Sequence, residues 1–173
     1  MKKILFNDKF QLTRLVLTER KTMTRRVLKG NTQKQLPYKV GEIVAIAQRY
    51  KELYPNADFE MVGNGFMTES AGWNNKMFVR ANLMPHHIKI TDVKIERLQD
   101  ISDEDCLKEG VRSFEGHENA ILHGIKEHYT ILNTFYVFDT PREAYAKLID
   151  KISGKGTWES NPWVSAYSFK LVE

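Results

Sequence analysis

Short hydrophobic runs separated by turn-forming residues alternate along this chain between two periodicities. Runs of β-branched, aliphatic and aromatic residues predict strands at residues 4–6, 42–47, 88–98 and 163–171. Apolar residues at helical spacing predict helices at residues 10–17, 103–109 and 141–152. Strands with helices inserted between them indicate an α+β protein, and we expect the strands to form a mostly antiparallel β-barrel.

The strand predicted at 88–98 contains an irregularity. Ile88 and Ile90 alternate on one face, whereas Val93 and Ile95 are displaced by one position. A one-residue slip moves side chains to the other face of a sheet, so a β-bulge is expected near Asp92.

Two of the predicted helices have clear end signals. Ser102 precedes an acidic first turn and Gly110 stands at the expected end, which bounds the helix at 103–109. Thr140, followed by a proline and then by Glu143, is typical of a capped helix start, and Gly154 ends that helix.

Two segments depart from the regular pattern and are interpreted as insertions in one domain spanning residues 1–173. The first, about 51–73, is rich in turn residues and has a candidate hairpin turn at Asn64-Gly65. The second, about 114–151, begins ambiguously. In it, hydrophobic residues at helical spacing precede a strand-like run at 135–138; they are Ile121, Leu122, Ile125 and Tyr129.

Composition narrows the class of protein. The 173 residues are 42% hydrophobic and 28% charged, with a net charge of +4, as in a soluble globular domain that can contact nucleic acid. Cys106 is the single cysteine and is expected in the core, so a disulfide framework and a cysteine-rich zinc site are excluded. No apolar run approaches the roughly 20 residues of a membrane span. We expect a cytoplasmic protein without membrane contact.

The histidines invite a metal interpretation, which their spacing disfavours. His86 and His87 are adjacent, and neighbours in a strand point to opposite sides. His123 and His128 are five residues apart, which is not the spacing that shares a helix face, and His117 stands apart. We predict no metal site and no cofactor.

Residues 19–26 concentrate the candidate chemistry. Four basic side chains and two hydroxyls occupy eight positions after the first helix; the basic ones are Arg20, Lys21, Arg25 and Arg26. Such a strip is a solvated face, a phosphate-binding patch or a catalytic strip.

The same strip resembles the signature of the ASCH domain, a PUA-like barrel family. Lys21, Thr24 and Arg26 fit the family pattern, whereas Glu19 stands where the family has glycine. Further similar segments are 90–93, 96–102, 154–158 and 161–164. The resemblance implies a PUA-like fold over most of the chain, like that of bacterial and phage-borne ASCH-like proteins.

More distantly, the strip is similar to bacterial amidohydrolases that remove the acetyl group from N4-acetylcytidine. The resemblance implies that Lys21 activates Thr24 as nucleophile and that a glutamate in a later helix, Glu109 or alternatively Glu104, protonates the leaving nitrogen. No metal is required. Burial and neighbouring arginines are expected to lower the pKa of Lys21. Lys21 and Thr24 point to opposite faces of a regular strand, so this mechanism requires a bend between them.

Two other functions remain open. A non-catalytic reader of RNA or of a modified nucleotide would use Lys21, Arg25 and Arg26 for phosphates, with Arg20 as a further binding candidate. Trp73 would stack on a base. A phage or mobile-element accessory protein would bind another protein. The predicted partner is therefore a modified nucleoside or RNA, and the sequence leaves the oligomeric state open.

Overall fold

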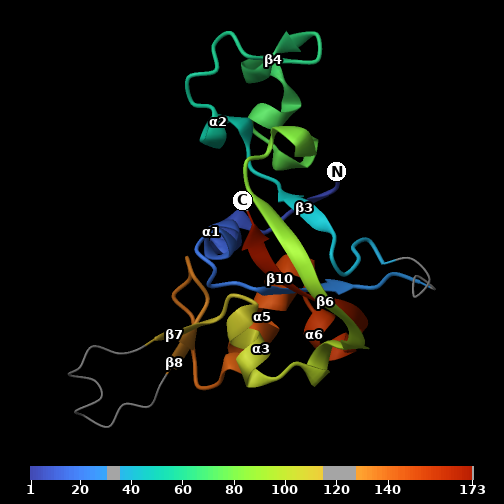
Figure 1. The fold of residues 1–173 in the computed structure, drawn as a ribbon. Helices are drawn as coiled ribbons and strands as arrows, with labels where there is room; N and C mark the ends of the chain where they lie inside the picture. Colours follow the sequence, from blue (N-terminus) through green and yellow to red (C-terminus); the bar gives the residue numbers. More distant parts are fainter. Residues whose placement is uncertain (31–35, 115–127, 173) are drawn as a thin grey trace.

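A mixed five-stranded sheet organises the chain in the computed structural model, which describes residues 1–30, 36–114 and 128–172 (Figure 1). Its strands, in spatial order, are β1 (Lys3–Ile4), β3 (Ile43–Ile46), β6 (His87–Arg97), β10 (Trp163–Val172) and β2 (Met23–Val27). The β1–β3 pair is parallel and the other three pairs are antiparallel. The α+β class is confirmed. In the described ladders β1 and β2 are the edges, so closure into a barrel stays a prediction.

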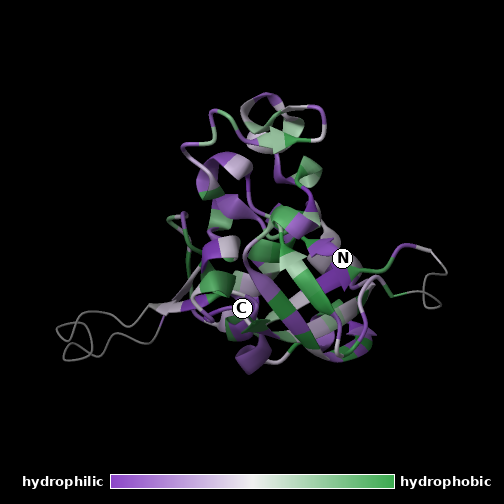
Figure 2. Cartoon of the chain, turned by 45° about the horizontal axis from the view of Figure 1, so that its top comes forward, coloured by the Kyte–Doolittle hydropathy of each residue, from purple (hydrophilic) through white to green (hydrophobic). Residues whose placement is uncertain are grey.

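The two long strands β6 and β10 form the middle of the sheet. Their register shifts at one point, because Ser168 pairs with Asp92 and Phe169 pairs with Ile90. Thr91 is therefore the extra residue on β6, which confirms the predicted bulge. Figure 2 shows hydrophobic and hydrophilic bands alternating along the strands at the centre of the body.

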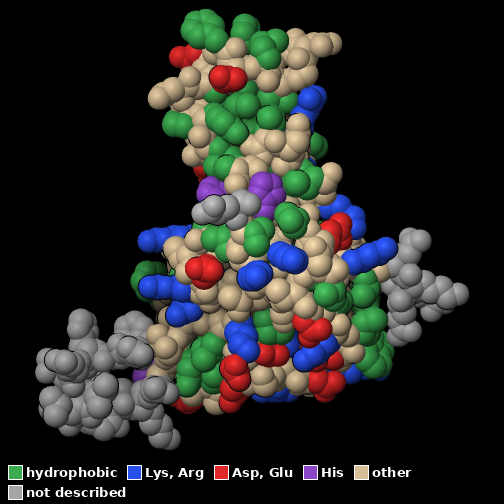
Figure 3. Space-filling view, in the orientation of Figure 1, with side chains coloured by type: hydrophobic (Ala, Val, Ile, Leu, Met, Phe, Trp, Pro, Cys, Tyr) green, Lys and Arg blue, Asp and Glu red, His purple; other side chains and the backbone are tan. Residues whose placement is uncertain are grey.

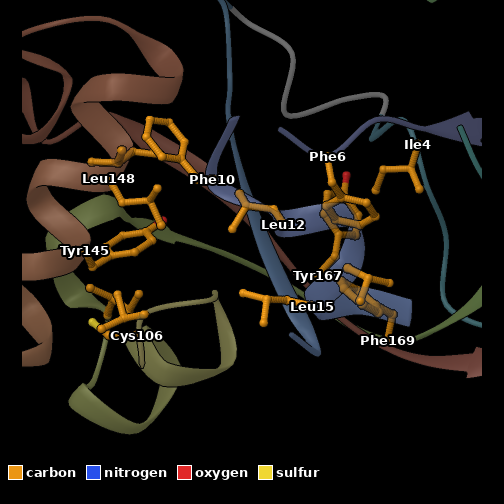
Figure 4. Packing of buried hydrophobic residues seen from close by; sticks show 14 of the residues in the cluster. Ile4, Phe6, Phe10, Leu12, Leu15, Cys106, Tyr145, Leu148, Tyr167 and Phe169 are labelled. Atoms are coloured by element: carbon orange, nitrogen blue, oxygen red, sulfur yellow. The ribbon is translucent and has the colours of Figure 1, made fainter. Parts of the chain in front are cut away.

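The helices pack against this sheet and bury one continuous core. They are α1 (Leu12–Leu17), which follows the 3₁₀ turn η1 (Asp8–Phe10), α3 (Asp103–Lys108), α5 (Pro141–Ser153) and α6 (Thr157–Ser160). Both predicted caps are present: Ser102 Oγ accepts from the Asp105 amide, and Thr140 Oγ1 accepts from the Glu143 amide. Figure 4 shows side chains from α1, α3, α5 and β10 meeting in the core.

The segment predicted as an excursion forms a lobe above the sheet (Figure 1). It contains α2 (Tyr50–Leu53), β4 (Met61–Val62) and β5 (Gly65–Phe66), followed by 3₁₀ turns at residues 67–69, 71–73, 76–78 and 81–83. Val62 pairs with Gly65, so the hairpin exists but its loop is Gly63-Asn64 and not Asn64-Gly65. The lobe has a small core of its own around Tyr50. Hydrophobic side chains also gather on its surface (Figure 3): Phe59, Met61, Phe66, Met77 and Phe78.

The second insertion is only partly helical. A three-stranded sheet, β7 (Arg112–Phe114), β8 (His128–Thr130) and β9 (Val137–Phe138), precedes α5. Tyr129, expected at helical spacing, belongs to β8, and the strand-like run at 135–138 is confirmed at its end by β9. Ile121, Leu122 and Ile125 lie outside the described residues.

None of the described helices is long and apolar enough to cross a membrane.

A left-handed residue joins α1 to β2. Glu19 has φ 56°, and the amides of Arg20 and Lys21 both donate to the Leu15 carbonyl, at 2.8 and 3.0 Å. This is the conformation that glycine adopts without steric cost. Glutamate at position 19 therefore still adopts the tight turn, although its backbone is strained there.

Replacing Glu19 tests that strain. Glu19→Gly should leave the free energy of unfolding unchanged or raise it by up to ~1 kcal/mol, because strain relief offsets the lost backbone entropy. Glu19→Val should lower it by about 1–2 kcal/mol, since a β-branched residue resists positive φ. Urea unfolding measures both. Arg20→Gly, at a neighbouring exposed residue without positive φ, is the control and should lower the free energy of unfolding. A higher free energy of unfolding for Arg20→Gly would contradict the explanation by backbone strain at Glu19.

Candidate functional site

A buried ion pair joins the start of β2 to the end of α3. Lys21 Nζ donates to Glu109 Oε2 at 2.8 Å and to the Glu109 carbonyl oxygen at 2.6 Å. Lys21 is 2% exposed and Glu109 is 4% exposed. Charged side chains are rarely buried to this extent unless they are paired, so the two residues require each other.

Arg25 extends this pair into a network of three carboxylates. Its guanidinium contacts Glu109 Oε1 at 3.2 Å, Glu96 Oε1 at 2.7 Å and Asp105 Oδ2 at 2.9 Å. The side chain is 1% exposed. Arg25 therefore serves as an internal counterion, and its charge does not reach solvent as a phosphate contact of the surface would require.

Burial shifts the protonation equilibrium of Lys21. Removal of the ammonium from water lowers the pKa of Lys21 below its ordinary value, and the positive charges of Arg26 and Arg25 add to that effect. The carboxylate of Glu109 opposes the shift without cancelling it. The neutral amine of a lysine can act as a general base, and a lowered pKa makes this form more abundant.

The catalytic hypothesis excludes a regular strand that runs from Lys21 to Thr24, and β2 begins only at Met23. Lys21 precedes β2, whereas Thr24 lies within it. Between them the Thr22 amide donates to the Lys108 carbonyl at 3.0 Å, and the Thr22 carbonyl accepts from the Phe169 amide at 2.9 Å. Gly110, with φ 114°, turns the chain after α3 so closely that a Cβ would stand 2.9 Å from Leu12. The segments before β2 and after α3 are thus held together.

Lys21, Thr24 and Glu109 line one cavity of about 90 Å³. Its floor is formed by these buried residues, and one wall is formed by α5. The exposed residues Ile152 and Ser153 lie at its rim. The other lining residues are Leu5, Phe6, Asn7, Leu12, Arg25, Arg26, Val27, Tyr145, Leu148 and Ile149.

Two buried polar atoms that belong to cavity-lining residues have no hydrogen-bond partner among the described residues. They are Arg26 Nε and the Tyr145 hydroxyl. The other end of Arg26 is held, because its Nη2 donates to the Leu5 carbonyl at 2.6 Å. Buried donors are nearly always paired, so both are candidates for contact with a bound molecule.

The remaining predicted residues lie away from this cavity. Arg20 is exposed, and Trp73 is half-buried in the lobe, where it packs on the small core. Glu104, the alternative acid, is 76% exposed at its side chain and pairs with Lys108 at 2.7 Å. Of the two glutamates, Glu109 is the one that contacts Lys21.

Cys106 and the histidines contribute no second site in the described residues. Cys106 is buried in α3, where burial and then the charge of Asp103 raise the pKa of its thiol to about 12. The described residues contain no group of three or more His, Cys, Asp or Glu side chains able to hold a metal ion. His117 and His123 lie outside the described residues.

Sequence reasoning missed the part that α5 and the carboxylates take in this site. Helical spacing of apolar residues predicts the helix at 141–152, and its apolar stripe also forms the cavity wall, through Tyr145, Leu148, Ile149 and Ile152. A tyrosine among aliphatic residues is the one signal that distinguishes this stripe from an ordinary core face. No sequence pattern indicates Glu96 and Asp105, because Arg25, with which they pair, is distant in the sequence.

The ion pair generates a stability prediction. Glu109→Ala leaves Lys21 and Arg25 buried without that carboxylate, so it should lower the free energy of unfolding by about 3–5 kcal/mol. Glu109→Gln should cost less, because an amide oxygen still accepts from Lys21. The control, Glu104→Ala, removes an exposed partner of Lys108 and should cost ~1 kcal/mol or less. Urea unfolding compares the three, and equal losses for Glu109→Ala and Glu104→Ala would contradict the assignment.

Comparison with known proteins gives a structural likeness at low sequence identity. No family model and no curated protein matches the sequence. Protein EF3133 from Enterococcus faecalis V583, of family model DUF984, has 15% identity and a TM-score of 0.49, with 99% of this chain and 80% of that chain covered. An ASCH domain from Lactobacillus crispatus JV V101 has 13% identity and a TM-score of 0.44, with 96% and 75% covered. Both likenesses concern the fold alone, and neither assigns a function to this chain.

Proposed function

We propose that this protein is a metal-independent amidohydrolase that removes an acyl group from N4-acetylcytidine or a similar modified nucleoside. The observation that carries the proposal is the convergence of Lys21, Thr24 and Glu109 on one cavity, with Lys21 Nζ 2.8 Å from Glu109 Oε2. These are the residue types needed for a base, a nucleophile and a proton donor.

Lys21 acts as the base for Thr24. A threonine hydroxyl is a weak nucleophile until its proton is removed, and a neutral lysine can remove it. The pKa of Lys21 is lowered by burial, which increases the neutral fraction. As Thr24 Oγ1 bonds to the acyl carbonyl carbon, its proton moves to Lys21 Nζ and a tetrahedral intermediate forms.

Glu109 passes that proton to the leaving group. The hydrogen bond between Lys21 Nζ and Glu109 Oε2 provides the path from the base to the carboxylate. The carbon–nitrogen bond then breaks, the exocyclic nitrogen takes the proton from Glu109, and the acyl group remains as an ester on Thr24. Water attacks this ester through the same base, which releases a carboxylic acid and restores the hydroxyl.

Arg25 keeps this cycle electrically balanced. Its guanidinium lies 3.2 Å from Glu109 Oε1, on the carboxylate oxygen that Lys21 does not bind. It therefore stabilises Glu109 as an anion while Lys21 is neutral. Glu109 thus keeps a cationic partner in either state of Lys21, which avoids the desolvation penalty of an unpaired buried charge.

A second candidate function, binding of RNA or a modified nucleotide without catalysis, is favoured by a different surface. A groove of about 410 Å³ beside α5 is lined by Lys9, Lys151, Tyr136 and the fully exposed Phe135. Lys147 Nζ lies 5.1 Å from the Tyr136 ring centroid. Cations interleaved with aromatic rings are typical of surfaces that bind single-stranded nucleic acid.

Hydrolysis of N4-acetylcytidine by the purified protein, followed by chromatography, tests the first proposal. Thr24→Val keeps the side-chain shape and removes the nucleophile, so turnover should fall by roughly 10,000-fold or more. Lys21→Met should reduce it by roughly 100- to 10,000-fold through loss of the base. Thr22→Val, at a neighbouring threonine that does not line the cavity, is the matched control and should retain activity.

Other outcomes separate the two candidates. Activity that survives Thr24→Val in a folded protein would exclude the nucleophile. No turnover by the wild type, together with RNA binding that weakens steeply as salt rises, would favour the binding function, because phosphate contacts release counterions.

The pH dependence of hydrolysis should report Lys21. Only neutral Lys21 accepts a proton, so kcat/KM should rise with pH and show its inflection at the pKa of Lys21, which burial lowers below its ordinary value. Arg26→Gln removes a charge that lowers this pKa, so the inflection should move to higher pH. Arg20→Gln, at an exposed arginine, serves as the control. An inflection unmoved by Arg26→Gln would argue against Lys21 as the titrating base.

A further inference from the structure

Helix α5 forms one wall of the cavity with a single face. Tyr145, Leu148, Ile149, Ile152 and Ser153 all line it, and their spacing of three, four, seven and eight residues puts them on one side of the helix. The middle of the wall is thus apolar, with the Tyr145 hydroxyl at its buried end and Ile152 and Ser153 near the rim. Any bound molecule has to fit between this face and Thr24.

The room between them is small. Pockets for drug-sized ligands typically have ~300–1,000 Å³, and one water takes up ~30 Å³ in the liquid. A cavity of about 90 Å³ therefore accepts a group of only a few heavy atoms. A whole nucleoside does not fit, whereas a short acyl group and its amide do.

The Tyr145 hydroxyl is suited to bind such a group. Tyr145 is 2% exposed, its oxygen has no partner among the described residues, and Figure 4 shows that oxygen pointing from α5 toward Leu12, which also lines the cavity. Arg26 Nε is a second unpaired donor. A carbonyl oxygen accepts two hydrogen bonds, so an acyl oxygen bound by Tyr145 can accept from one further donor.

We infer that α5 selects the acyl group: the cavity admits short-chain acyl amides only, and Tyr145 positions the acyl oxygen for attack by Thr24. This inference rests on the proposed amidohydrolase function. Leu148, Ile149 and Ile152 contact the alkyl end, and the amine portion, nucleoside included, stays outside the cavity. Selectivity is consequently strict for the acyl chain and loose for the amine.

A series of N4-acylcytidines with two to six acyl carbons tests the size limit. For the wild type, each methylene beyond the available room should reduce kcat/KM by roughly 10- to 200-fold. Ile152→Ala opens the rim and should restore at least part of the loss for longer chains. Ile95→Ala is the matched control, since Ile95 is 40% exposed and Ile152 is 39% exposed, and Ile95 does not line the cavity. An identical chain-length profile in Ile152→Ala and wild type would overturn the inference.

Tyr145→Phe tests the hydrogen bond. It should reduce kcat/KM for the acetyl substrate by roughly 10- to 1,000-fold, as expected for loss of one donor to a developing oxyanion. Its resistance to urea should be equal to that of the wild type or higher, because the variant removes an unpaired buried hydroxyl. A structural tyrosine would give the reverse result, with lower stability and unchanged kcat/KM.

Binding of simple amides separates this inference from the proposed reaction. Acetamide, butyramide and hexanamide are titrated at millimolar concentration into the Thr24→Val protein, and amide chemical shifts are followed by NMR. Binding of acetamide that weakens in Thr24→Val/Tyr145→Phe, with no binding of hexanamide, supports acyl selection even if no acylcytidine is hydrolysed. Hydrolysis without chain-length preference would support the proposed amidohydrolase function and contradict acyl selection by α5. Absence of both hydrolysis and acetamide binding would remove both.

Discussion

The burial of Lys21 determines much of the architecture around it. An ammonium removed from water costs several kcal/mol unless carboxylate and carbonyl oxygens replace its hydration. Glu109 supplies both, through its side chain and its main-chain carbonyl, so the end of α3 is fixed against the start of β2. Arg25 then balances the carboxylate, and Glu96 and Asp105 balance Arg25. A chain of alternating charges thus runs from the cavity floor to the surface.

The same network explains why the basic residues of the strip 19–26 do not together form a basic surface. Four cations stand close together in the sequence, but they have different surroundings in the fold. Arg20 faces solvent, Lys21 and Arg25 are paired internally, and Arg26 is held by the Leu5 carbonyl. Solvent-facing lysines instead line the groove around Tyr136 beside α5.

Local sequence patterns predicted the helices, strands and turns well. They did not predict contacts between side chains that are distant in the sequence. The bulge opposite Ser168, the capped helices α3 and α5 and the hairpin of the lobe follow from signals within a few residues of each other. The orientation of Arg25 does not, because its carboxylate partners are 71 to 84 residues away along the chain. Lys21, Thr24 and Glu109 were predicted from a motif and a helix position. The size of the cavity between them depends on α5, whose distance from β2 no local pattern encodes.

Helix α5 has a consequence for how this protein can change. Its boundaries are set by Thr140 and Gly154, and its cavity face is separate in sequence from the ionic network on β2 and α3. Substitutions along that one face can change the shape of the cavity while the ion pair of Lys21 and Glu109 stays as it is. The wall of the cavity and the ionic network at its floor are thus separable in the sequence, and mutation of one helix can remodel the first without disturbing the second.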